Sequence, residues 1–170
     1  MTLFFTSDTH FGDHRTLNIH KRPFASVAEM DAALLAAWNE MVGEEDEVWH
    51  LGDFARRAAD VLGLLARLHG RKHLVRGNND PPGTVEAEGW TSVRDYAELE
   101  VEGRLLILCH YPFRTWRDQH KGSIDLHGHS HGKLKPMKRQ FDVGGGRLEL
   151  AAGDVGGDSS RIGAVPPRRF

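Results

Sequence analysis

Short hydrophobic runs alternate with stretches of helical periodicity in the first half of the chain. Three apolar runs, each ended by glycine or turn residues, indicate buried strands. They cover residues 3–6, 47–51 and 73–75. Ser26, with Glu29 three residues later, predicts a capped helix start, and apolar residues at helical spacing continue the helix to Val42. Residues 58–69 predict a second helix, so the order of elements favours a layered α/β fold.

The second half of the chain carries hairpin signals instead. Glu102-Gly103 separates apolar runs at residues 97–101 and 104–109, which predicts a tight turn between antiparallel strands. Further apolar runs cover residues 124–126, 141–143 and 148–150. The last two flank a glycine-rich stretch, which predicts a second hairpin.

The end of the chain differs in composition from the rest. Residues 151–170 are rich in glycine and close on Pro-Pro-Arg-Arg-Phe, so we expect this tail to be loosely ordered. The full length of 170 residues is that of one domain, and the sequence contains no internal repeat. We therefore predict one domain over residues 1–150, followed by a tail over residues 151–170.

Composition and charge exclude several classes of protein. The 39% hydrophobic and 27% charged fractions are typical of a soluble globular protein. A net charge of -2 disfavours nucleic acid as a partner but leaves a small nucleotide open. No run has the length of a membrane span or the pattern of a signal peptide, so we expect no membrane partner and a cytoplasmic location. The single cysteine, Cys109, excludes an internal disulfide and is expected to be a buried strand residue.

Polar clusters follow the hydrophobic runs and contain seven potential metal ligands. These are Asp8 with His10, then Asp53, Asn78, His110, and finally His129 with His131. A sheet aligns the carboxyl ends of its strands, so residues far apart in sequence can converge there. Seven Asp, Asn and His ligands are too many for one tetrahedral ion. They suit two ions that share a bridging carboxylate, an arrangement used for in-line displacement at phosphorus.

Spacing within the clusters supports this interpretation. In an extended segment, residues two apart face the same side, so Asp8 and His10 can reach one ion. His129 and His131 repeat this spacing, and the glycines at 128 and 132 allow the backbone to turn tightly around them. Asp53 follows a glycine at a predicted strand end, where its carboxylate can bridge two cations.

The clusters, in this order, resemble the signature of the calcineurin-like metallophosphoesterase superfamily. That signature runs Asp-x-His, Gly-Asp, Gly-Asn-His-Asp/Glu, His and Gly-His-x-His. Here it reads Asp8-Thr9-His10, Gly52-Asp53, Gly77-Asn78-Asn79-Asp80, His110 and Gly128-His129-Ser130-His131, and the match spans residues 3–143. The resemblance implies a four-layer α/β fold: a β-sandwich of mixed sheets flanked by helices, with a dinuclear metal site at strand carboxyl ends.

The resemblance also implies a ligand set and a reaction. One ion would be held by Asp8, His10, Asp53 and His131, and the other by Asp53, Asn78, His110 and His129. The implied reaction is hydrolysis of a small phosphoester, for example a nucleotide, by attack of a metal-bridging hydroxide. We favour phosphodiesters because the short chain has no obvious cap. Manganese is the expected ion, although iron, zinc, nickel and cobalt also tolerate these ligands. The sequence leaves the physiological substrate and the oligomeric state open.

One position departs from the family pattern. Asn79 replaces a histidine that, in the family, contacts the phosphoryl group and is thought to protonate the leaving group. An amide cannot deliver a proton at neutral pH, so we expect slower hydrolysis of alkyl esters than of activated esters. Two alternatives stay open: a catalytically weakened metal-binding or regulatory protein, and a nuclease.

Three further residues are candidates for catalytic roles. Asp80 closes the motif that contains Asn79, and Arg56 follows the Gly52-Asp53 turn closely enough to bind phosphate. His14 could replace the missing acid, although a solvated loop histidine is the favoured interpretation. His20 is expected to be an ordinary surface or core histidine. The polar segment 111–122 either covers the site or is a solvated loop.

Overall fold

Two mixed β-sheets packed face to face form the centre of the computed structural model, which describes residues 1–56, 61–145 and 149–151. The first sheet is built from β1 (Leu3–Thr6), β2 (Glu47–His50), β3 (Arg71–Val75), β4 (Ser92–Arg94) and β9 (Glu149–Ala151). Its order is β4-β3-β2-β1-β9, in which all neighbours are parallel except β1 and β9. The three hydrophobic runs of the first half therefore form its parallel centre, as predicted.

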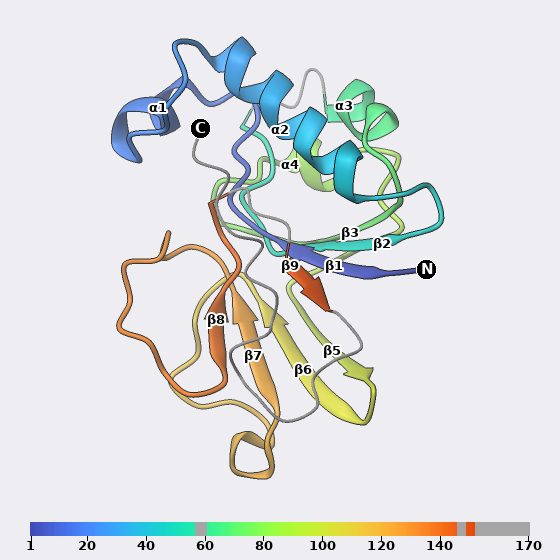
Figure 1. Cartoon of the computed structure of the whole chain (residues 1–170), viewed down its shortest axis with the longest axis vertical. Coiled ribbons are helices and arrows are strands. Elements are labelled where there is room, and N and C mark those ends of the chain that lie inside the picture. The colour runs from blue at the N-terminus through green and yellow to red at the C-terminus, as the bar shows by residue number, and fades with distance from the viewer. Residues whose placement is uncertain (57–60, 146–148, 152–170) are drawn as a thin grey trace.

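Helices lie on the outer side of the first sheet (Figure 1). They are α1 (His14–Ile19), α2 (Val27–Met41), α3 (Val61–Arg67) and α4 (Pro82–Val85). The predicted cap of α2 is confirmed, because the Ser26 hydroxyl accepts a hydrogen bond of 3.1 Å from the backbone N–H of Glu29. Trp38 of α2 and Leu65 of α3 pack with Val48 of β2 in one apolar core between helices and sheet.

The second sheet contains β5 (Tyr96–Val101), β6 (Arg104–Cys109), β7 (Ile124–His127) and β8 (Gln140–Asp142). The predicted hairpin joins β5 to β6, and Glu102 and Gly103 both have positive φ, as a tight two-residue turn requires. Strands β7 and β8 continue the sheet in parallel. A second apolar core fills the space between the sheets, where Phe5 and Trp49 meet Leu108.

The second predicted hairpin is wrong. Strand β8 pairs with β7 in the second sheet, whereas β9 pairs with β1 in the first. Local pattern predicts two strands on either side of glycines, but it does not decide which sheet each strand joins. Val143, directly after β8, is buried between the sheets, and its N–H bonds to the carbonyl of His127. Most of the predicted tail, residues 152–170, falls outside the described residues.

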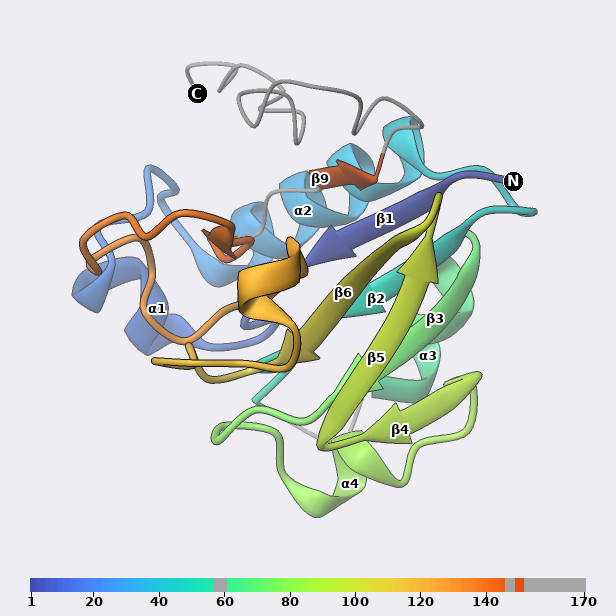
Figure 2. The same cartoon turned by 90° about the horizontal axis from the view of Figure 1, so that it is seen from below.

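The expected fold class is confirmed: two mixed sheets, flanked by helices, form an α/β sandwich. The view in Figure 2 shows β5 and β6 crossing over the strands of the first sheet. Segment 111–123, with the short 3-10 helix η2 (Gln119–Lys121), packs on the outer side of the second sheet, where Arg117 pairs with Glu98. Cys109 is buried, as expected. Among the described residues, no helix combines the length and apolar character that a membrane crossing needs.

Candidate dinuclear metal site

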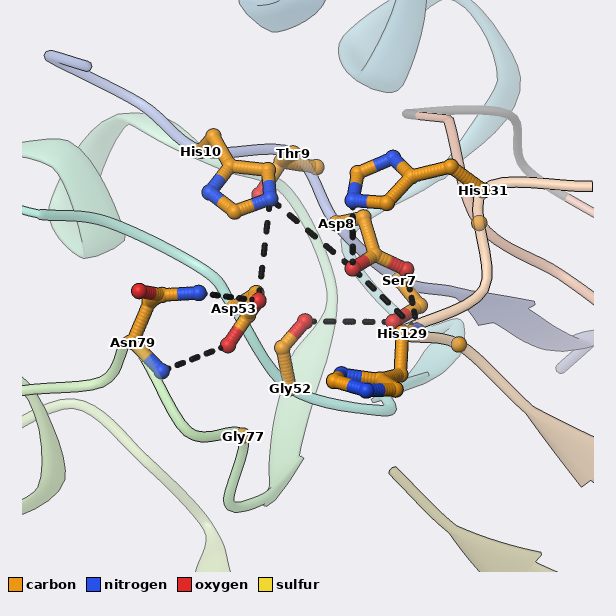
Figure 3. A network of polar contacts seen from close by, with 12 residues as sticks. Ser7, Asp8, Thr9, His10, Gly52, Asp53, Gly77, Asn79, His129 and His131 are labelled. Carbon is orange, nitrogen blue, oxygen red and sulfur yellow. Dashed lines mark hydrogen bonds and ion pairs between the residues drawn. The ribbon is translucent and has the colours of Figure 1, made fainter. Parts of the chain in front are cut away.

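The candidate ligands converge where β1, β2, β3, β6 and β7 end, and they form two groups. In the first group, His131 Nε2 lies 3.5 Å from Asp8 Oδ1, and His10 Nε2 lies 3.8 Å from the same oxygen (Figure 3). In the second group, Asn78 Oδ1 lies 3.0 Å from His110 Nε2 and 2.9 Å from His129 Nδ1. Residues spread over the whole domain are thus brought to one place.

Asp53 lies between the two groups. Its Oδ2 is 3.7 Å from His10 Nε2, and its Oδ1 is 3.6 Å from His110 Nε2. One carboxylate therefore presents a different oxygen to each group, which is the geometry of a carboxylate shared by two cations. Both Asp8 and Asp53 are buried, so their negative charges lie in a region where water solvates them poorly.

The buried atoms of the first group fit a divalent ion. The separations of 3.5 to 3.8 Å are too long for hydrogen bonds, and buried His10 Nε2 has no hydrogen-bond partner. Such separations suit atoms that share an ion, because each ligand atom then lies about 2.0–2.2 Å from the metal. The group combines imidazole nitrogens with carboxylate oxygens, which are ordinary ligands of divalent transition metals.

Protonation in the first group is also suited to metal binding. Burial, as the main cause, lowers the pKa of His10 and of His131 to about 4, so both imidazoles are neutral at pH 7 and keep a lone pair. Burial is the main cause that raises the pKa of Asp8 to about 7; the nearby charges of Asp53 and Asp142 act in the same direction, and hydrogen bonds from Ser7 and His129 act against it. A cation would remove this repulsion and favour the ionised carboxylate.

Most of the candidate ligands have left-handed backbone conformations. Positive φ angles occur at Asp8 (56°), His10 (52°), Asp53 (57°), His129 (64°) and His131 (49°). The expected extended segments are therefore wrong, although the paired side chains do converge. A left-handed non-glycine residue costs roughly 1–2 kcal/mol, and such residues cluster at functional sites. Hydrogen bonds from the N–H of Asp8 to the carbonyl of Gly52 and from His10 to Asp53 hold the first of these turns.

Two glycines are required by close packing around the ligands. A Cβ atom on Gly128 would lie 1.9 Å from Ser7 Oγ, and one on Gly77 would lie 2.3 Å from Asp53 Oδ1. No side chain fits at either position without moving the ligand loops. The glycines of the sequence motif thus permit close approach of one ligand loop to another.

Asn79 faces the shared carboxylate. Its backbone N–H donates to Asp53 Oδ1 at 2.8 Å, and its side-chain Nδ2 donates to Oδ2 at 2.8 Å. The residue that departs from the family pattern therefore holds both oxygens of Asp53 in place (Figure 3).

Asp80 faces the backbone instead of the ligand atoms. Its carboxylate accepts hydrogen bonds from the N–H groups of Gly77 (2.8 Å), Asp53 (2.9 Å) and Phe54 (2.7 Å). Burial raises its pKa to about 6, and these hydrogen bonds act in the opposite direction. Its contacts are those of a residue that ties the loop after β3 to the loop after β2, and so positions Asp53.

The other two catalytic candidates lie beside α1. His14 is its first residue, in a helix where a loop was expected, and its side chain is exposed. Arg56 Nη1 lies 3.6 Å from Asp13 Oδ2, the carboxylate that caps α1. These contacts place Arg56 against the helix cap instead of against the ligand groups.

Two residues outside the sequence motifs hold the ligand loops. The Arg22 guanidinium donates hydrogen bonds to the carbonyls of Asp8 and Thr9, inside the first ligand turn. The Asp142 carboxylate accepts from the Ser130 hydroxyl and, at 2.7 Å, from the N–H of Gly132, on either side of His131. Neither residue lies in a motif, so no local signal identifies them.

His20 also differs from its expected role as an ordinary histidine. Its ring stacks on His131 with a centroid distance of 3.7 Å and an interplanar angle of 16°. Burial, then the positive charges of Lys133 and Arg22, lowers the pKa of His20. A third imidazole thus lies against the first group, brought there by the end of α1.

Comparisons with known proteins agree with this geometry. The family model described as "Calcineurin-like phosphoesterase superfamily domain" matches residues 1–164. The Gene 66 protein of Mycobacterium phage D29 is 32% identical over 175 aligned positions, which cover 84% of this chain and 86% of the phage protein. An uncharacterized protein of Methanocaldococcus jannaschii is 31% identical over 151 positions, with 83% and 80% covered.

A solved structure shows the same fold. A protein of unknown function from Aquifex aeolicus superposes with a TM-score of 0.66 at 22% identity, over 84% of this chain and 89% of the other. The family match extends over almost the whole sequence and includes every candidate ligand. The chain belongs to the calcineurin-like phosphoesterase superfamily.

Proposed function

We propose that this protein is a hydrolase of phosphodiesters that depends on two divalent metal ions. Membership of the superfamily supports phosphoesterase activity in general. The observation that carries the dinuclear proposal is the position of Asp53, whose two oxygens face different ligand groups at 3.7 and 3.6 Å. Manganese stays the predicted ion, and the cytoplasm the predicted location.

The chain offers a complete ligand set for the two ions. Asp8, His10, Asp53 and His131 would hold one, and Asp53, Asn78, His110 and His129 the other. Ions bound there supply a water of lowered pKa as the nucleophile and neutralise charge on the phosphoryl oxygens.

The residues around the ligands orient and restrain the site. Asn79 fixes the carboxylate of Asp53, while Asp80 fixes the backbone that carries it. Arg22 holds the first ligand turn and Asp142 the last. Because each ligand is held before substrate arrives, little reorganisation is needed during the reaction.

Exposure of the second group supports a diester substrate. Asn78 and His129 are exposed, whereas Asp8, His10 and His110 are buried. A phosphoryl group that enters from this open side has room for a second ester substituent. The amide of Asn79 holds no transferable proton, so a leaving group of low pKa is favoured over an alkoxide.

A metal-by-substrate screen tests the proposal. Metal-free protein is reloaded with manganese, iron, zinc, nickel or cobalt and assayed on a chromogenic diester, a chromogenic monoester and cyclic nucleotides. We expect diester turnover that requires metal and exceeds monoester turnover. Stoichiometric metal binding without turnover of any substrate would contradict the proposal.

Metal binding without turnover would favour the second candidate function, that of a metal-binding or regulatory protein. The hydrogen bonds from Asn79 to Asp53 favour a metal-binding or regulatory protein if they stabilise the site without assisting a leaving group. Restoring histidine at position 79 distinguishes the two functions, since a regulatory protein gains no turnover from the change.

A further inference from the structure

A basic, exposed segment follows the last candidate ligand. It comprises residues 132–139, which we call the basic segment, and it carries Lys133, Lys135, Lys138 and Arg139 but no acidic residue. Residues 132–138 are all exposed. The segment begins one residue after His131 and leads to β8. In Figure 1 it forms part of the long loop beside β8, on the side of the molecule where α1 lies.

The segment starts at the rim of the candidate metal site. The backbone N–H of Lys133 donates to the carbonyl of Ser130 at 3.0 Å, two residues from His131, and the His20 ring stacks on His131 at 3.7 Å. Lys21 follows His20 and is exposed, and Arg22 lies next to it. The end of α1 and the start of the basic segment therefore place positive charge beside the first ligand group.

These lysines are not neutralised by nearby carboxylates. Across residues 1–56 and 61–145, no ion pair joins Lys133, Lys135 or Lys138 to an acidic side chain. The neighbouring segment 111–123 behaves differently, because Arg117 pairs with Glu98 and Lys121 pairs with Asp118 at 2.9 Å. Three lysines without a carboxylate partner among these residues therefore lie in one short segment that begins next to His131.

Exposed apolar side chains accompany the charge. Tyr111, which is 46% exposed, lies beside the second ligand group, and its ring centroid is 5.0 Å from that of His110 and 4.9 Å from that of His129. Leu134 and Met137 are exposed within the basic segment itself. Surfaces that bind single-stranded nucleic acid combine backbone-contacting cations with aromatic rings on which bases stack.

We propose that the basic segment and Tyr111 bind a single-stranded polynucleotide across the candidate metal site. The lysines contact phosphates that flank the scissile one, and Tyr111 stacks on a base next to it. The proposal rests on the proposed phosphodiesterase function and names its substrate class. The overall charge of -2 does not oppose it, because the surface near the site differs from the average of the chain.

Binding of labelled oligonucleotides tests the proposal directly. Fluorescein-labelled phosphorothioate DNA and RNA strands of 4, 8 and 16 nucleotides are titrated with the metal-loaded protein, and anisotropy is followed at several salt concentrations. The test variant is Lys133→Ala/Lys135→Ala. The matched control is Arg67→Ala/Arg71→Ala, which removes the same charge at the end of α3 and at the start of β3, the strand end away from the site.

We expect affinity to increase with strand length and to fall at least tenfold in the lysine variant, with less than a twofold change in the control. The slope of log affinity against log salt should become shallower by about 1.4, since each phosphate contact on a single strand contributes about 0.7. Tyr111→Ala should weaken binding about fivefold or more, and Tyr111→Phe should keep it. The DNA and RNA arms show which strand is preferred.

The result that overturns the proposal is distinct from failure of the proposed function. Equal losses in the lysine variant and its control, or no effect of strand length, would overturn the polynucleotide surface. Hydrolysis of a chromogenic diester by the unmodified protein shows separately whether the proposed function holds. If the diester is hydrolysed but no strand binds, the surface proposal fails alone. If strands bind as expected but no phosphoester is cleaved, the proposed function fails and the surface stands.

Discussion

The two ligand groups differ in how the fold supports them. In the first group, Asp8 is fully buried, His10 is 6% exposed, and the backbone is held by Arg22. In the second group, Asn78 and His129 are exposed and reach the site from loops after β3 and β7. The first group is thus the more enclosed of the two, and two members of the second are open to solvent. Asp53 connects the two groups, because its two oxygens face His10 in the first and His110 in the second.

The largest expected effect comes from removing the shared carboxylate. Asp53→Asn should lower diester turnover by about 10³-fold or more, because the ions contribute several kcal/mol of charge stabilisation that requires both groups. Metal analysis should show fewer than two ions per chain, with thermal melting as the check on folding. Two retained ions with near-normal turnover would remove the special role of Asp53.

Restoring the family histidine at position 79 should increase the rate at which alkyl leaving groups depart. Asn79→His should raise turnover of an alkyl phosphodiester by up to about 10²-fold, the lower end of what general acid catalysis supplies. A chromogenic diester, which needs little protonation of its leaving group, should gain much less. Equal changes for the two substrates would show that the variant acts through Asp53, whose oxygens Asn79 holds.

Residues that hold the ligand loops should affect metal affinity more than the chemical step. Arg22→Met and Asp142→Asn should each weaken metal binding about 10- to 100-fold, because the first removes the donors to the ligand turn and the second removes a charge and one of two acceptor oxygens that orient the last ligand loop. Saturating metal should restore most of the turnover number. Loss of turnover that excess metal does not restore would place these residues closer to the reaction.

Asp8 should make metal binding in the first group depend on pH. Its raised pKa of about 7 means that an entering cation displaces a proton at lower pH. Apparent affinity should therefore fall by up to about tenfold per pH unit below 7 and level off above it. His10 and His131, with pKa values of about 4, stay neutral over this window. Calorimetric titration from pH 5.5 to 8 checks this, and a flat profile would contradict it.

Much of the fold follows from local pattern. The hydrophobic runs locate the central strands, Ser26 locates the start of α2, and Glu102-Gly103 locates the hairpin in the second sheet. The pairing of β9 with β1 does not follow, because glycines between two apolar runs are compatible with a hairpin and with a crossing between sheets. Short elements such as α1 and β4 were also missed, since few residues carry their pattern.

The sequence predicts those site residues that stand close together in short motifs. The seven candidate ligands were identified because they stand in short polar clusters at strand ends. The left-handed backbone at Asp8 and His10 was not predicted, because a spacing of two residues is compatible with several backbone conformations. The contacts of His20 and Asp142 arise only when distant loops meet in the folded chain.

A crystal of protein reloaded with manganese, measured at the manganese absorption edge, tests the central claim most directly. We expect two anomalous peaks within about 4 Å of each other, one on each side of Asp53. One peak should lie near Asp8, His10 and His131, and the other near Asn78, His110 and His129. A single peak, or a pair that leaves Asp53 uncoordinated, would show that Asp53 does not bridge two ions.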